Sequence, residues 1–179
     1  MAIESTQEQP SYVVHADGTV LLNRAGFEAQ ARYKEALAAH HRLSRSWAGA
    51  TLAALFLQHG WLEAITLSFD VSPEYDDSGG FYRSILCRPS QPRAVAGHAL
   101  PEDAFPDGTF DPDAATDLVD QALEDSAFDL YAGLGGRSDG FDDLTVSLAR
   151  DPVAALLQSS PVDGALACAA WELPLSPDA

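Results

Sequence analysis

The stretch that decides the fold runs from Trp61 to Arg88 and reads "WLEAITLSFDVSPEYDDSGGFYRSILCR". Apolar, β-branched and aromatic side chains fill its two ends, residues 61–70 and 80–88, and this composition predicts two β-strands. The segment between the ends is short and polar, and it contains a proline and glycines. Because strands joined by a short polar loop pair most simply with each other, we expect an antiparallel hairpin.

The loop of this hairpin contains four carboxylates, which are candidate ligands for Ca²⁺ or Mg²⁺ because both ions prefer oxygen. They are Asp70, Glu74, Asp76 and Asp77. The spacing of a calcium-binding loop, with acids at alternate positions followed by a glycine and a bidentate glutamate, is missing. A hairpin tip also requires polar residues and glycines for backbone reasons alone. We therefore predict a solvated loop with no metal and no cofactor. An enzyme or a Ca²⁺-dependent protein that uses the Asp70–Asp77 loop stays as an alternative.

Before the central hairpin, the pattern predicts a smaller hairpin followed by a helix. Residues 11–15 and 19–22 are short apolar runs joined at Asp17-Gly18, a dipeptide that favours a type I′ turn. Asn23 can cap the helix that follows, which carries charges of both signs and extends to about Ser44.

A second helix is expected directly after the first. Ser46 can cap this helix, and Gly60 follows its C-terminal end. Alanine, leucine and phenylalanine occupy nearly all of its faces, so it is the best candidate for the most buried helix.

The C-terminal part of the chain alternates helices and strands after an irregular beginning. Residues 88–112 contain five prolines, which predict an irregular connection along the surface. An amphipathic helix then begins at Pro112 and is ended by Gly133. We expect next a strand, a short helix and a last strand, at residues 144–150, 151–158 and 164–173. The order ββ-αα-ββ-α-β-α-β predicts an α+β fold: a single domain over residues 1–179, with a largely antiparallel sheet and helices packed on one face.

The size and composition of the chain favour a cytoplasmic protein. Its 179 residues can bury a core without disulfides or metals. The two cysteines, Cys87 and Cys168, lie in apolar segments and are expected to be buried, reduced thiols. No run of about 18 apolar residues occurs, so we predict no membrane span. The first ten residues lack the basic end and the apolar run of a secretory signal.

The net charge of −17 is extreme, and it is unevenly distributed. Residues 1–93 contain 10 acids and 8 bases, whereas residues 94–179 contain 17 acids and only two bases. Salt adaptation would place acids over the whole surface, and the near-neutral half does not show this. Solubility alone is one explanation of the acidic half, and attraction of a basic partner is the other.

Four carboxylates recur at helical spacing on the amphipathic helix. At 100° per residue they form a narrow stripe opposite the apolar face, with neighbours about 5–6 Å apart. Such a row of like charges slightly destabilises its own helix and resembles the phosphates of a nucleic-acid strand. We predict that the stripe and two acids beside it bind a basic protein surface, that of a nucleic-acid-binding complex. The predicted contact residues are Asp113, Asp117, Asp120, Glu124, Asp125 and Asp129.

No catalytic motif is found in a setting that supports it. The segment "GRSDG" at 136–140 matches a hydrolase nucleophile elbow, but a helix is expected before it and a strand after it, which reverses the required order. Ser138 is therefore rejected as a nucleophile. The five histidines form no motif of metal-ligand spacing, and we predict a non-enzymatic protein. Basic residues interleaved with aromatic ones are also missing, which argues against direct binding of nucleic acid.

Residues 27–85 resemble a family of uncharacterised small bacterial proteins that are often carried on mobile elements. The family has two helices and then a strand leading to F-D-G-x-G-D-S-G. The matching segments here are "FEAQARYKEAL", "TLAALFLQHG", "ITLSFD" and "DDSGG". Val71 replaces the glycine after F-D, and "SPEYD" widens the gap before Asp77-Ser78-Gly79. The resemblance implies an origin on a mobile element, and with it an anti-defence role such as blocking a CRISPR or restriction complex.

The leading hypothesis is thus an acidic, non-enzymatic binding protein, in its specific form a nucleic-acid-mimicking inhibitor of the anti-CRISPR or anti-restriction type. The alternative from another class is an acidic chaperone or accessory subunit that binds its partner through an apolar patch. The two differ in their response to salt, because charge pairs are screened at high ionic strength whereas apolar contacts persist. The sequence does not predict the oligomeric state.

Overall fold

The computed structural model describes residues 9–137 and 140–173. The contacts within the chain divide it into two compact units, with the boundary between His40 and His41. The described residues do not include Ser138, which was rejected as a nucleophile. They also do not include residues 1–8, which form most of the segment that was judged to lack a secretory signal. No helix in the described part is long and apolar enough to cross a membrane.

The first unit contains the small hairpin and the beginning of a long helix. Strands β1 (Tyr12–Val14) and β2 (Val20–Leu22) pair antiparallel beside a turn at Gly18, whose φ of +84° favours glycine. Asn23 caps α1 (Arg24–Gln58), since its side-chain oxygen accepts a hydrogen bond from an amide of the first turn at 2.8 Å. The predicted hairpin and the predicted cap are both confirmed. The type I′ turn is not, because it requires a positive φ at both central residues and Asp17 does not have one.

The prediction of two helices divided near Ser44 is wrong, because α1 continues without a break to Gln58. No proline or glycine lies between residues 40 and 48, so nothing in the backbone ends the helix there. The two serines that suggested an end and a new cap lie inside the helix. The expected burial of the later part is confirmed at Leu52 and Phe56, which are completely buried.

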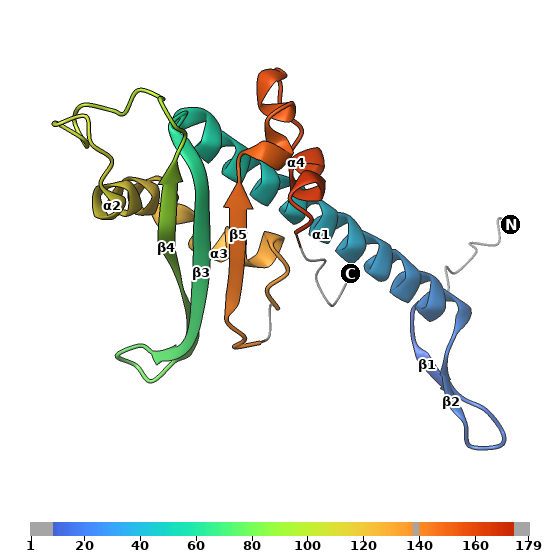
Figure 1. The fold of residues 1–179 in the computed structure, drawn as a ribbon. Helices are drawn as coiled ribbons and strands as arrows, with labels where there is room; N and C mark the ends of the chain where they lie inside the picture. The colour runs from blue at the N-terminus through green and yellow to red at the C-terminus, as the bar shows by residue number, and fades with distance from the viewer. Residues whose placement is uncertain (1–8, 138–139, 174–179) are drawn as a thin grey trace, which may run out of the picture. The chain divides into compact units, whose positions relative to one another are not determined.

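The second unit is built on a three-stranded antiparallel sheet with the order β4-β3-β5. Strands β3 (Leu62–Tyr75) and β4 (Phe81–Ala94) form the predicted hairpin, and β5 (Leu144–Ala149) pairs with the other side of β3. The strands of the hairpin are longer than predicted, so that residues 76–80 alone make the turn. Figure 1 shows this sheet in green and orange, with α2, α3 and the later part of α1 behind one of its faces and α4 beside β5.

The strand β4 also contains Pro89 and Pro92, which corrects the prediction of an irregular connection beginning at Arg88. Proline is tolerated there because β4 is an edge strand and need not donate hydrogen bonds on both sides. Gln91 lies between the two prolines with a φ of +53°, and the register with β3 shifts near Ala64. The irregular connection begins only after Ala94.

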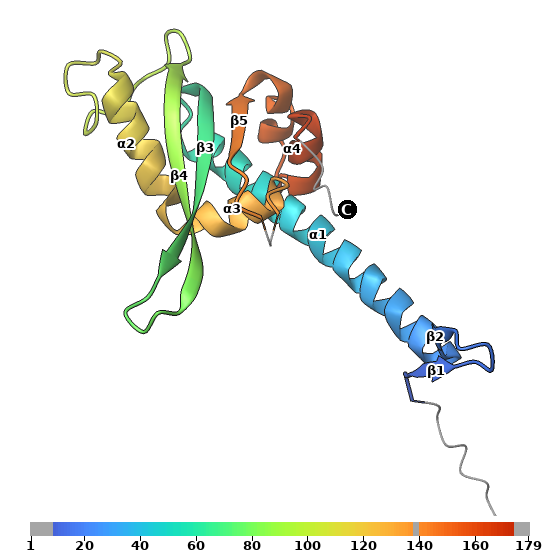
Figure 2. The same cartoon turned by 90° about the horizontal axis from the view of Figure 1, so that it is seen from below.

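The predicted amphipathic helix is present but divided. It consists of α2 (Pro112–Leu123), a 3₁₀ turn (Glu124–Ser126) and α3 (Ala127–Gly133). Figure 2 shows α2 alongside β4, and the central hairpin extending past α3 to its tip. In place of the short helix expected at 151–158 there are two 3₁₀ turns, Asp151–Val153 and Leu156–Gln158.

The last strand predicted at 164–173 is wrong, because this segment forms the helix α4 (Gly164–Ala170). Asp163 caps α4, its carboxylate accepting the amide of Ala165 at 2.8 Å. Small residues then allow close packing on α1: a Cβ added to Gly164 would overlap the carbonyl oxygen of Ser46, and one added to Gly49 would overlap the backbone of α4. This contact requires glycine at both positions. The prediction of a strand was based on the apolar composition of the segment, which does not reveal such a contact.

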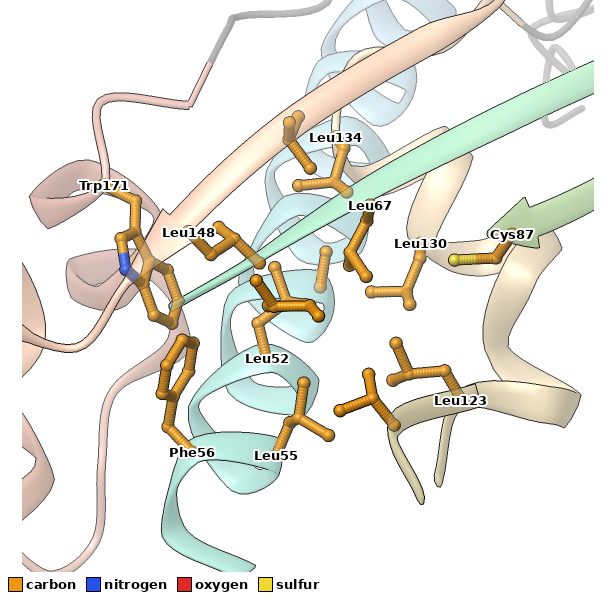
Figure 3. Packing of buried hydrophobic residues seen from close by; sticks show 14 of the residues in the cluster. Leu52, Leu55, Phe56, Leu67, Cys87, Leu123, Leu130, Leu134, Leu148 and Trp171 are labelled. Carbon is orange, nitrogen blue, oxygen red and sulfur yellow. The ribbon is translucent and has the colours of Figure 1, made fainter. Parts of the chain in front are cut away.

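The core of the second unit lies between the sheet and the helices. Ile65, Leu67 and Phe69 alternate along β3 and are buried on the face that the helices cover. Figure 3 shows leucines from α1, α3 and the sheet meeting in this layer, with the rings of Phe56 and Trp171, 5.6 Å apart, at one side. The predicted α+β class, with an antiparallel sheet and helices packed on one face, is confirmed.

Candidate protein-binding site

The helix α2 is held by its first turn and by one apolar side. Asp111 caps it, the carboxylate accepting the amide of Asp113 at 2.9 Å, and the proline at the first helical position fits the fixed φ required there. Ala115, Val119 and Leu123 are buried, and the helix packs against β4. The opposite side of α2 therefore faces solvent on a fixed support.

The four carboxylates predicted to form a stripe, Asp113, Asp117, Asp120 and Glu124, are all exposed. No ion pair within the described chain includes any of them. Asp113, Asp117 and Asp120 lie on α2, and Glu124 is the first residue of the 3₁₀ turn that follows it. At a rise of 1.5 Å per residue the stripe is about 16 Å long, with one carboxylate per roughly 5.5 Å. A DNA strand has one phosphate per about 3.4 Å of helix axis, so the stripe is less densely charged than a nucleic-acid backbone. Its spacing suits separate lysine or arginine side chains on a protein.

The other two predicted contact residues are exposed but do not continue the helical spacing. Asp125 lies in the 3₁₀ turn that ends α2, and Asp129 lies in the first turn of α3. Because the turn interrupts the helix, an i+4 rule across it no longer places side chains in one row. These two acids form a separate acidic edge beyond the stripe.

Asp120 has an electrostatic effect on the strand beneath the helix. Burial raises the pKa of Cys87, on β4, to about 12, and the negative charge of Asp120 adds to this shift. Cys87 is therefore a neutral thiol at physiological pH. Both Cys87 and Cys168 are buried and not disulfide-bonded, as predicted.

The carboxylates at the beginning of the hairpin loop have structural partners on β4. Asp70 forms an ion pair with Arg88. The side chain of Arg88 is 63% exposed and that of Asp70 is 50% exposed, so solvent screening limits the contribution of this ion pair to stability. Glu74 accepts a hydrogen bond from the hydroxyl of Tyr82 at 2.7 Å. Both contacts join neighbouring strands of the hairpin.

The turn itself depends on Asp76. Its carboxylate accepts the hydroxyl of Ser78 at 2.7 Å and the amide of Gly80 at 2.6 Å, and these hydrogen bonds lower its pKa. Asp77 is exposed beside it. Among the described residues, no group of three or more His, Cys, Asp or Glu is arranged to hold a metal ion. The loop is therefore a solvent-exposed turn that is stabilised by the carboxylate of Asp76.

A surface hollow of about 480 Å³ is lined by His59, Trp61, His98 and Asp103, among others. Burial lowers the pKa of His59, which is therefore neutral at physiological pH. The indole N–H of Trp61 is buried and has no hydrogen-bond partner within the described chain. The ring of Trp61 meets those of His59 and Phe105 edge to face, at 5.7 and 5.5 Å, so the indole acts as a packing element of the core.

Sequence reasoning missed a second surface, which we call the aromatic patch. Its residues are Tyr75, Phe81, Arg83, Phe128 and Phe141. The rings of Tyr75 and Phe81 are 5.7 Å apart, and those of Phe81 and Phe141 are 5.9 Å apart, both edge to face. Tyr75 and Phe81 are also cross-strand partners that flank the turn. The placement of one aromatic residue on each side of the turn was the only sequence feature that pointed to this patch. Nothing in the sequence spacing linked Tyr75 and Phe81 to Phe128 or Phe141.

Arg83 fixes the patch to the rest of the unit. Its guanidinium donates hydrogen bonds to the carbonyls of Arg137 and Gly140, at 2.6 and 3.1 Å. The same group lies 5.7 Å from the ring centres of Phe128 and Tyr131. Arg83 therefore connects the hairpin with α3 and with the chain that follows it.

Comparisons of the chain with protein-family models, with curated proteins and with solved structures find no match. The resemblance described for residues 27–85 therefore stays a prediction.

Proposed function

We propose that this protein is a non-enzymatic binding protein that engages a basic surface of a partner protein through α2. The observation that carries the proposal is the stripe Asp113, Asp117, Asp120 and Glu124, which is exposed, without ion pairs in the described chain, and mounted on a capped helix. Like charges at this spacing slightly destabilise a helix. A partner that supplies lysine or arginine side chains would remove that repulsion and gain charge complementarity.

The proposed partner is a nucleic-acid-binding protein of a bacterial defence complex, of the CRISPR or restriction type. A surface built for phosphates is basic, and the strongly negative net charge of this protein would accelerate encounter with it. Because the stripe has fewer charges per length than a nucleic-acid strand, it would occupy part of such a surface and not trace it completely.

The test compares two variants of equal net charge. In the first, Asp117→Asn, Asp120→Asn and Glu124→Gln remove three of the four charges of the stripe but keep the shape of each side chain. In the matched control, Glu102→Gln, Asp107→Asn and Glu172→Gln remove three exposed acids elsewhere in the second unit. Tagged wild type and both variants are used to capture proteins from a native bacterial lysate, with quantification by mass spectrometry.

We expect a basic protein that wild type and the control retain, and that the stripe variant retains about tenfold less, because three charge pairs contribute about 1.4 kcal/mol in total. Added duplex DNA and raised salt are expected to release this protein as well. Equal loss in both variants would show that overall charge, and not the stripe, is responsible. That result would refute the proposal.

A second candidate function is an accessory subunit or chaperone that binds through apolar contacts. The specific observation that favours it is the aromatic patch, where Tyr75 is 71% and Phe81 56% exposed. A complex of this kind would survive high salt in the same capture experiment, and the stripe variant would retain it.

A further inference from the structure

The aromatic patch is a surface that the stripe on α2 does not include. Its four rings are exposed, Phe128 by 58% and Phe141 by 45% in addition to Tyr75 and Phe81. Burial of a large apolar side chain contributes about 1.5–3 kcal/mol, so leaving four rings together in water forgoes much stability. Three of the rings are in contact through Phe81, and Phe128 lies against the guanidinium of Arg83. Exposed aromatic side chains gathered in this way indicate an interaction surface.

The patch is ordered before any partner arrives. The ring of Phe81 meets those of Tyr75 and Phe141 edge to face, and the cross-strand register places Tyr75 opposite Phe81. Hydrogen bonds from Arg83 hold the chain at Arg137 and Gly140 against the hairpin. Binding would therefore immobilise few further side chains, which is the condition under which apolar contacts convert into affinity. Aromatic and arginine side chains are also the types enriched where binding energy concentrates.

The surroundings of the patch are acidic. The described segments that carry it, 74–83, 128–137 and 140–143, contain six acids and two arginines. Arg83 is already engaged by two backbone carbonyls and two aromatic rings. A lysine or arginine from a partner can lie over an exposed ring face while its charge approaches carboxylates at the rim.

We infer that the aromatic patch binds a segment of a partner protein in which apolar side chains are flanked by lysine or arginine. Single-stranded nucleic acid also stacks on exposed rings, but the proteins that bind it place those rings in basic grooves. An acidic rim repels phosphate, so a protein segment is the occupant that the charges fit. The inference shares a basic partner with the proposed function but uses different residues.

The test uses a short fluorescent peptide of alternating lysine and leucine, with binding followed by anisotropy. The patch variant is Tyr75→Ser with Phe141→Ser. The matched control is Leu57→Ser with Leu166→Ser, which removes two apolar side chains that are 51% and 56% exposed on other elements. We expect the patch variant to bind about tenfold more weakly than wild type, and the control within about twofold. If the double variant is unfolded by circular dichroism, Tyr75→Ser alone is expected to weaken binding about threefold.

Matched probes separate the contributions of charge and apolar contact. Peptides with glutamate in place of lysine, or serine in place of leucine, are each expected to bind at least about tenfold more weakly. The stripe variant described above is expected to bind the lysine–leucine peptide within about threefold of wild type, so that the two proposals fail separately. The inference is overturned if wild type does not bind this peptide, if the patch variant binds it as well as wild type does, or if labelled oligothymidylate binds more tightly.

Discussion

Two helices of the second unit are attached to it in opposite ways. The later part of α1 meets α4 backbone to backbone, with Gly49 against Gly164 and the thiol of Cys168 donating to the carbonyl of Arg45 at 3.1 Å. By contrast, α2 meets β4 through one line of apolar side chains and shows carboxylates on its other side. The α1–α4 contact tolerates almost no change in shape, whereas the outer face of α2 can change its chemistry without touching the core. The tightest contact of the unit and the surface proposed to bind a partner thus lie on different helices.

The largest effect is expected where the backbones touch. Gly164→Ala adds a methyl group that overlaps the carbonyl oxygen of Ser46, so α4 must move away from α1. We expect a loss of about 3 kcal/mol or more in the free energy of unfolding, measured by urea denaturation. Ala165→Gly, at an exposed position of the same helix, is the control and should cost about 1 kcal/mol. Equal effects of the two substitutions would mean that the contact is not tight.

The next largest effect is expected at Arg150, which holds the C-terminal end of α1. Its guanidinium donates hydrogen bonds to the carbonyls of His59 at 2.9 Å and Leu62 at 2.8 Å, and also to that of Phe56. Arg150→Met keeps the volume but removes all three of these hydrogen bonds, although the carbonyl of His59 still accepts the amide of Leu62 at 2.8 Å. We expect the unfolding free energy to fall by about 2–4 kcal/mol. Arg93→Met, an exposed arginine on β4, should change it by less than about 0.5 kcal/mol. A thermal melt that shows no difference between the two variants would contradict this role.

The dependence of the unfolding free energy on pH tests whether the thiol of Cys87, on β4 beneath α2, is buried. The pKa of Cys87 is raised from 9.0 to about 12 in the folded protein, so the thiol ionises in the unfolded chain first. This group has no effect on stability below pH about 9, and it lowers stability as the pH rises from there toward 12. Between pH 9 and 10 we expect wild type to lose about 1 kcal/mol more than Cys87→Ala does. Parallel pH profiles for the two proteins would show that Cys87 is not shielded.

The smallest effect is expected at the stripe itself. Replacing Asp117, Asp120 and Glu124 by Asn, Asn and Gln removes repulsion between neighbours on α2, and should raise the unfolding free energy by about 0.2–0.5 kcal/mol per pair. The gain should vanish in high salt, where the repulsion is already screened. A loss of stability instead would mean that these carboxylates support the fold, and would contradict the contrast drawn between α2 and α1.

Most of the sheet could be predicted from the sequence, because strand composition and turn residues are local signals. The central hairpin and β5 follow from the letters at 61–88 and 144–149. Two elements could not be predicted in the same way. The joining of α1 depends on the absence of a break near Ser44, and the helical state of 164–170 depends on a contact with residues more than a hundred positions earlier. At 164–170 tertiary packing outweighs local propensity, whereas at Ser44 the sequence contains no residue that breaks a helix and the two serines were misleading.

The candidate site was predictable in part for the same reason. The carboxylates of α2 follow from helical spacing, which is local, and the structure finds them exposed. Asp125 and Asp129 do not continue the row of carboxylates because a 3₁₀ turn separates α2 from α3. This turn could not be predicted because it has no clear sequence signal. The aromatic patch joins residues from two distant segments, so only the folded chain brings it together.

The prolines of β4 have a consequence for the behaviour of the protein at high concentration. An outer strand offers unpaired amides and carbonyls to any extended chain that arrives, and this is the usual route to edge-to-edge aggregation. Pro89 and Pro92 each lack an amide hydrogen, so a foreign strand laid along β4 would find donors missing from its ladder. The long central hairpin can therefore extend its aromatic tip into solvent while its flank resists polymerisation.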